Sequence, residues 1–164
     1  MDSGQRQYLE QRYRASEWHG RDTARRQMIT GFDFSGSELS GWMLYRKRRD
    51  ERATPPSIRS LWHRGDPASE LLAIDVWECV SIIAAHSQLF EVLANVQSDA
   101  VERHGGLGDV AFRLGHTMAL FGRINVVVLV RNAGPKTVNV DPVARALDEL
   151  LVRLAEPPHP SRRR

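Results

Sequence analysis

The chain has 164 residues, the usual size of a single domain with one core. Hydrophobic residues make up 41% and charged residues 26%, which excludes the disordered and fibrous classes of protein. The formal net charge is only +3, from 23 basic and 20 acidic residues, so most of the chain is nearly balanced in charge despite a pI near 9.5.

No apolar run approaches the roughly 20 residues that span a bilayer. The N-terminus up to Arg14 is too charged for the apolar region of a signal peptide. We therefore expect a cytoplasmic protein without a membrane partner. The single cysteine, Cys79, lies in an apolar stretch, which predicts a buried reduced thiol.

The excess of basic residues is concentrated in three places. These are the N-terminal segment, the run Arg46-Lys47-Arg48-Arg49, and the last residues of the chain, 162–164. Such clusters either bind phosphates or form solvated surfaces.

The first half of the chain predicts an arm followed by alternating elements. Residues 1–27 read as an N-terminal arm or peripheral helix, and 28–34 as a short strand. Ser37 is then placed to cap a helix over 38–50. The pair Pro55-Pro56 ends that helix, and 57–63 predicts a second strand.

The stretch 70–96 is almost continuously apolar, and two interpretations remain open. In the first, which we favour, a helix to about Glu78 is followed by a buried strand over 79–85 and a helix over 87–103. In the second, one long buried helix runs through the whole stretch.

After the glycines near 106, residues 109–121 predict a helix with a stripe of small side chains at Ala111, Gly115 and Ala119. Residues 124–130 are apolar on both faces and predict a buried central strand. A last helix begins with Asp141 as its N-cap and carries one apolar face, and 157–164 reads as a disordered basic tail.

The alternation of these elements predicts one α/β domain over 28–156, in which helices on both faces flank a small parallel sheet in three layers, as in a flavodoxin-like fold. Ligands of such sheets bind beyond the carboxyl ends of the strands. This rule selects three loops, 35–38, 63–67 and 86–88.

One segment adds a family resemblance. Residues 109–123 run from Asp109 through Arg113 to Gly122-Arg123 and precede a valine-rich strand. This segment resembles bacterial TIR-like (Toll/interleukin receptor-like) nucleotide-binding domains, in which an N-V-x-F-E-L-G helix precedes a G-R turn and a strand. The loops at 34–38 and 63–67 resemble the family's loops after its first and second strands. The resemblance implies a TIR-like fold over roughly residues 28–131 and a nucleotide ligand.

The sequence departs from that family at the position that matters most for catalysis. Active members cleave the nicotinamide-ribose bond of NAD with a glutamate in that helix, and the matching residue here is Arg113. An arginine cannot supply the negative charge that the reaction needs. The resemblance therefore implies binding without NAD hydrolysis, unless Glu38 or Asp66 supplies the carboxylate.

The expected ligand-binding residues are those of the selected loops together with Arg113, which lies near a predicted helix N-terminus that attracts anions. They are Ser35, Gly36, Ser37, Glu38, His63, Arg64, Asp66, His86 and Arg113. Arg113 has an alternative role as a surface charge paired with Asp109. The histidines lack the spacing of metal ligands, so we expect no metal site, and the pattern assigns no cofactor.

Three functions follow as hypotheses. The first is a TIR-like domain that binds a nucleotide or a partner protein in a bacterial signalling or defence pathway. The second is a structural or interaction module, homo-oligomeric or with a protein partner, whose basic termini contact nucleic acid or that partner. The third is an NAD-cleaving or deoxyribosyltransferase-like enzyme.

Overall fold

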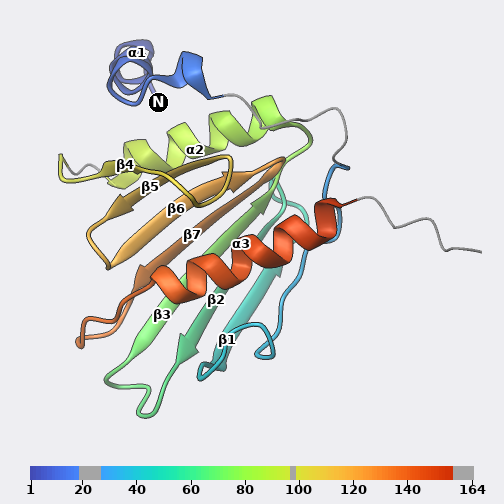
Figure 1. Cartoon of the computed structure of the whole chain (residues 1–164), viewed down its shortest axis with the longest axis vertical. Coiled ribbons are helices and arrows are strands. Elements are labelled where there is room, and N and C mark those ends of the chain that lie inside the picture. The colour runs from blue at the N-terminus through green and yellow to red at the C-terminus, as the bar shows by residue number, and fades with distance from the viewer. Residues whose placement is uncertain (19–26, 97–98, 157–164) are drawn as a thin grey trace, which may run out of the picture.

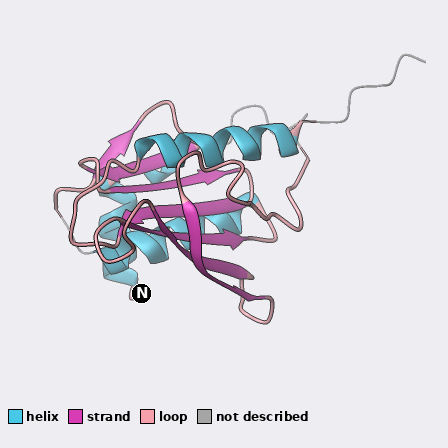
Figure 2. Cartoon of the chain, turned by 90° about the horizontal axis from the view of Figure 1, so that it is seen from below, coloured by secondary structure: helices cyan, strands magenta, loops and turns pink. Residues whose placement is uncertain are grey.

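The computed structural model describes residues 1–18, 27–96 and 99–156, which form one seven-stranded sheet with helices on both sides (Figures 1 and 2). The strands are β1 (Met43–Asp50), β2 (Ser57–His63), β3 (Leu71–Glu78), β4 (Glu102–His104), β5 (Val110–Leu114), β6 (Met118–Arg123) and β7 (Val126–Asn132). The helices are α1 (Ser3–Arg12), the short 3-10 helix η1 (Ala15–Glu17), α2 (Ile82–Val96) and α3 (Asp141–Ala155).

The sheet consists of two antiparallel meanders that meet at its centre. The strand order is β1-β2-β3-β7-β6-β5-β4, and every neighbouring pair is antiparallel. After β3, helix α2 carries the chain to the far edge, and β4 to β7 return until β7 pairs with β3, with Ile74 opposite Val130. β1 therefore lies at one edge of the sheet and the short β4 at the other.

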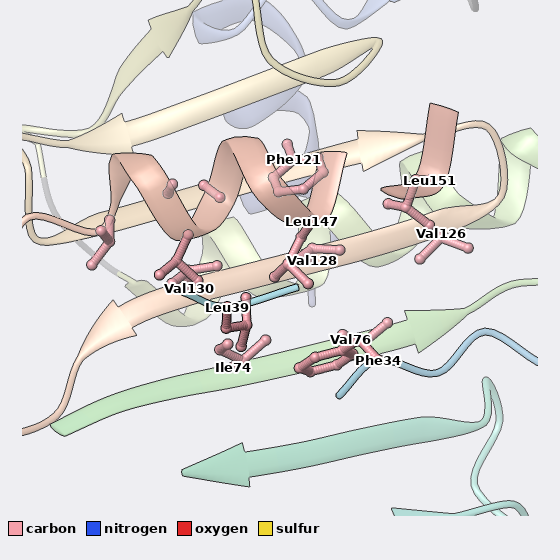
Figure 3. Packing of buried hydrophobic residues seen from close by; sticks show 14 of the residues in the cluster. Phe34, Leu39, Ile74, Val76, Phe121, Val126, Val128, Val130, Leu147 and Leu151 are labelled. Atoms are coloured by element: carbon pink, nitrogen blue, oxygen red, sulfur yellow. The ribbon is translucent and has the colours of Figure 1, made fainter. Parts of the chain in front are cut away.

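One face of the sheet is covered by α3 and by the loop segment 29–42 (Figure 3). Leu147 and Leu151 of α3 pack over β7, next to Val128 and Val126 respectively. Phe34 and Leu39 of the segment pack over β3. The segment is also tied to the sheet by Asn125, whose side chain accepts a hydrogen bond from the backbone N–H of Ile29 and donates one to its carbonyl.

The opposite face is covered over β4 to β7 and at the Trp77 end of β3. The apolar side of α2, with Leu89 and Leu93, packs there together with Phe112 and Leu120 of the sheet. α1 lies outside α2, and Trp18 after η1 stacks on Phe90 with ring centroids 4.6 Å apart. On the same face, none of the described helices contacts β1 or β2, and α2 contacts β3 at the end that carries Trp77.

The expected parallel, three-layer flavodoxin-like or TIR-like α/β fold is wrong, because the sheet is antiparallel throughout. The predicted helix over 109–121 is in fact the hairpin of β5 and β6. Gly115 turns the chain there with a φ of +52°, and Ala111 and Ala119 end on the same face of neighbouring strands. The segment on which the resemblance rested thus has a different structure from the one it implied.

Three further elements differ from the prediction. Most of the predicted helix 38–50 is strand β1, and the predicted strand 28–34 is irregular. In the stretch 70–96, the single long helix is wrong, and so are the first helix and the strand 79–85 of the favoured interpretation, whereas its helix over 87–103 is confirmed as far as Val96. The strand lies earlier than expected, at Leu71–Glu78, and the helix α2 begins at Ile82.

The best-patterned elements are confirmed. The strand 57–63 is β2, and the valine-rich strand is β7, which lies in the middle of the sheet with both faces buried. The last helix is α3, with Asp141 as its first residue and Val140 as its cap. The predicted basic tail, 157–164, lies outside the described residues. None of the helices in the described ranges is long and apolar enough to cross a membrane.

Candidate anion-binding surface

The bare half of the sheet carries a cluster of arginines that we call the arginine face: Arg46, Arg48, Arg59 and Arg131. The strand register places them on one side of the sheet. Arg46 is opposite Leu61, Leu61 opposite Ala73, and Ala73 opposite Arg131. In the next row Arg48 is opposite Arg59, and Arg59 is opposite Asp75. Since residues directly opposite share a face, the two rows form one continuous surface over four strands.

Asp75 is the carboxylate at the centre of this surface. Its Oδ1 lies 3.8 Å from Nε of Arg59 and its Oδ2 lies 3.5 Å from Nη2 of Arg131. Only 8% of Asp75 is exposed, and burial raises its pKa although both arginines act in the opposite direction. The side chains of Arg59 and Arg131 are 73% and 55% exposed, so these long ion pairs leave both guanidinium groups largely in contact with solvent.

The two arginines of β1, Arg46 and Arg48, are neutralised even less than Arg59 and Arg131. Among the described residues, Arg46 and Arg48 form no ion pair. Lys47 and Arg49, which alternate with them on the other face, both bind Asp33, with Arg49 Nη2 3.2 Å from Oδ2. The positive charge of β1 is therefore neutralised on the covered face and left available on the open face.

Two adjoining hollows give the arginine face its shape. One, of about 260 Å³, has Leu61 and Ala73 between the arginines, and the other, of about 340 Å³, continues toward Trp77 and Gln88. Arg48 and Arg59 line both hollows, so the depression is continuous and its middle is basic. Guanidinium groups in such an arrangement bind carboxylates or phosphates through paired N–H donors.

The start of β1 adds exposed apolar side chains to the same edge. Met43, Leu44 and Tyr45 are all about half exposed or more. Tyr45 lies at a bulge in the register and meets the ring of His63 edge-on at 6.1 Å. The edge strand thus passes from an apolar to a basic section.

The predicted residues of the 35–38 loop form a self-contained turn. Glu38 accepts hydrogen bonds from the backbone N–H and the hydroxyl of Ser35, both at 2.8 Å, and from the hydroxyl of Ser37 at 3.1 Å. These bonds, those from Ser35 first, lower the pKa of Glu38. Gly36 lies against the ring of Trp62. The carboxylate is therefore ionised and engaged by its own loop.

The residues of the 63–66 turn lie at the same end of the sheet. The guanidinium of Arg64 lies 4.8 Å from the ring centroid of Trp42 and binds Glu70, with Nε 2.7 Å from Oε2. Asp66 accepts a hydrogen bond from the N–H of Ala68, so it organises the turn. His63 contributes its ring to the edge of the arginine face.

The other two predicted residues lie elsewhere. His86 is on α2, where its ring meets Trp18 at 5.6 Å. Arg113 is on β5, on the face that α3 covers, opposite Glu102 and Ala119. The structure thus brings the loops 35–38 and 63–66 to one end of the sheet, but it joins neither His86 nor Arg113 to them.

Sequence reasoning missed Arg59, Asp75 and Arg131 and assigned Arg46 and Arg48 to a helix. The run from Arg46 to Arg49 was visible as a basic cluster, and as a strand it would have placed alternate charges on opposite faces. Its partners on β2, β3 and β7 come from distant parts of the chain, so no local pattern connects them.

The other buried polar groups of the fold have structural partners. Arg123, 9% exposed, binds Asp148 through two 2.8 Å contacts and Asp109 at 3.1 Å. Cys79 is buried, as predicted, and burial raises the pKa of its thiol to about 11. In the described ranges, no group of three or more His, Cys, Asp or Glu side chains is placed to hold a metal ion.

Compared with known proteins, the chain matches no family model, no curated protein and no solved structure.

Proposed function

We propose that the protein is a binding module that holds an acidic segment of a partner protein against the arginine face. The observation that carries this proposal is the set of four arginines around the carboxylate of Asp75, on the part of the sheet that the described helices leave open. This proposal retains the interaction-module hypothesis from the sequence, with the contact surface on the sheet instead of the chain termini.

Exposed arginines without partners are suited to binding because they do not have to give up an ion pair first. Arg46 and Arg48 meet this condition among the described residues, and Arg59 and Arg131 have only long contacts to Asp75. A carboxylate that approaches them gains charge-assisted hydrogen bonds, and the local positive potential accelerates the encounter.

One feature favours a polypeptide over a nucleic acid. Met43, Leu44 and Tyr45 expose apolar surface at the start of the strand that carries Arg46 and Arg48. An acidic segment that also contains apolar residues complements both sections of β1.

Direct binding of two probes of equal charge tests the proposal. One is a peptide in which glutamate alternates with threonine, and the other is an oligodeoxythymidylate. We expect the peptide to bind more tightly, with an affinity that falls as salt is raised, because exposed charges are screened. Tighter binding of the oligodeoxythymidylate would make the face a nucleic-acid surface and contradict the proposal.

A pair of matched variants locates the binding. In Arg46→Gln/Arg48→Gln the arginine face loses two charges, and in Arg145→Gln/Arg153→Gln the exposed side of α3 loses two. We expect the first variant to bind the peptide about tenfold more weakly, since each exposed charge contact contributes up to about 1 kcal/mol. The second variant has the same net charge as the first, and it should bind the peptide as tightly as the wild type does.

A further inference from the structure

We infer that the acidic segment binds as an added strand, paired with the outer edge of β1. This inference rests on the proposed function and specifies how the partner is held. β1 ends the sheet, and within the described ranges its backbone pairs only with β2. Its outer N–H and C=O groups therefore form a row that another extended chain can use.

The two edges of the sheet differ in their capacity for such pairing. β1 has 8 residues, and β4 at the opposite edge has 3. A strand of the length of β1 extends about 27 Å, at about 3.4 Å per residue. The bulge at Tyr45 interrupts the regular register, and beyond it the section from Arg46 to Asp50 offers consecutive backbone groups that can align a partner along the basic part of the strand.

Charge selects an acidic chain as the occupant. A strand paired with β1 places its alternate side chains opposite Arg46 and Arg48 on the open face, where acidic residues complement them. The intervening side chains face Lys47 and Arg49, which Asp33 already binds. The partner therefore does not need acidic residues at these positions. Alternating acidic and uncharged residues therefore fit the edge.

The same charges exclude a second copy of this chain as the occupant. If two β1 strands paired with each other, the run from Arg46 to Arg49 of one would lie along a strand with the same basic run. Like charges directly opposite each other are destabilising, and basic residues on an edge are a known means of preventing such pairing. The edge thus discriminates between self-association and an acidic partner.

Backbone methylation of the probe peptide tests strand addition directly. The parent peptide has the length of β1, with glutamate at every second position and threonine between. One derivative carries N-methyl groups on the glutamates and the other on the threonines, with charge unchanged in both. In an added strand, the backbone N–H groups of only one of these two sets point toward β1.

We expect one derivative to lose at least about tenfold in affinity for the full chain and the other to bind nearly as the parent does. The outward amides of β1 should also exchange their hydrogens at least about tenfold more slowly when the parent is bound. Equal affinity of the two derivatives, with no slowing at β1, would overturn strand addition while leaving the arginine face as the binding surface. If the parent itself does not bind, both proposals are overturned.

Discussion

Arg48 on β1 is the cross-strand partner of Arg59 on β2, on the half of the sheet that the described helices leave bare. Like charges directly opposite each other destabilise a sheet. Asp75, the nearest carboxylate in this row, is opposite Arg59 and does not pair with Arg48. The repulsion between Arg48 and Arg59 therefore destabilises the folded protein, and an acidic partner bound to them would reduce this repulsion.

The substitution Arg48→Thr should stabilise the free protein. It removes the repulsion from Arg59 and introduces a residue that favours strands, so we expect a gain of about 0.5 kcal/mol in the free energy of unfolding in urea. Arg46→Thr is the matched control, because it makes the same change opposite the uncharged Leu61. An equal gain in both variants would show that strand propensity alone is responsible.

Neutralising Asp75 should strengthen binding. Asp75→Asn keeps the shape of the side chain and removes the negative charge from the arginine face, so the acidic peptide should bind about two- to fivefold more tightly at neutral pH. Isothermal titration calorimetry of the two proteins at one salt concentration measures the difference. Unchanged or weaker binding would place the peptide away from Asp75.

The same residue predicts a pH effect on stability. Because burial raises the pKa of Asp75 above its ordinary value of 3.8, the folded protein binds more protons than the unfolded chain just above that value. The stability contributed by Asp75 is therefore fully present below pH 3.8 and lost as the pH rises through the raised pKa. Urea unfolding across this window should show the wild type losing stability, with rising pH, relative to Asp75→Asn.

Asp33 should show the opposite dependence. Burial raises its pKa, but the hydrogen bond from Lys47 and the charges of Lys47 and Arg49 outweigh burial, and its pKa lies below the ordinary value. Its contribution to stability is present above pH 3.8 and lost as the pH falls through the lowered pKa. The difference in unfolding free energy between wild type and Asp33→Asn should thus shrink on acidification. A difference that grows at low pH would contradict this account.

The buried ion group at Arg123 should be essential to the fold. Arg123→Ala removes the guanidinium group that binds the carboxylates of Asp109 and Asp148, and breaking a buried pair in this way costs about 3–5 kcal/mol. Chemical unfolding measures the loss, and Arg145→Ala on the exposed side of α3 is the control. A loss below 1 kcal/mol, on the scale of an exposed pair, would show that the group contributes little.

Local patterns predicted the elements whose surroundings are simple. β7 is buried on both faces and α3 on one, and these environments leave a regular apolar pattern in the sequence. β1 leaves no such pattern, because both of its faces carry basic side chains. A spacing of four residues, as in Ala111, Gly115 and Ala119, fits either a helix or a hairpin that turns at Gly115, and the sequence could not distinguish them.

The strand directions and the candidate surface depend on pairings between distant segments. β3 meets β7 only after α2 and three strands have carried the chain to the far edge and back. Arg59 and Arg131 come together through that pairing, since Asp75 of β3 lies between them. The sequence showed the basic run of β1 but not the surface that completes it.

A nuclear magnetic resonance titration of the isotope-labelled full chain with the acidic peptide tests the central claim most directly. The account predicts that the largest amide shift changes occur along β1 and beside Arg59 and Arg131, and that Arg46→Gln/Arg48→Gln removes them. Shift changes confined to α3, to α1 or to the chain termini would contradict it.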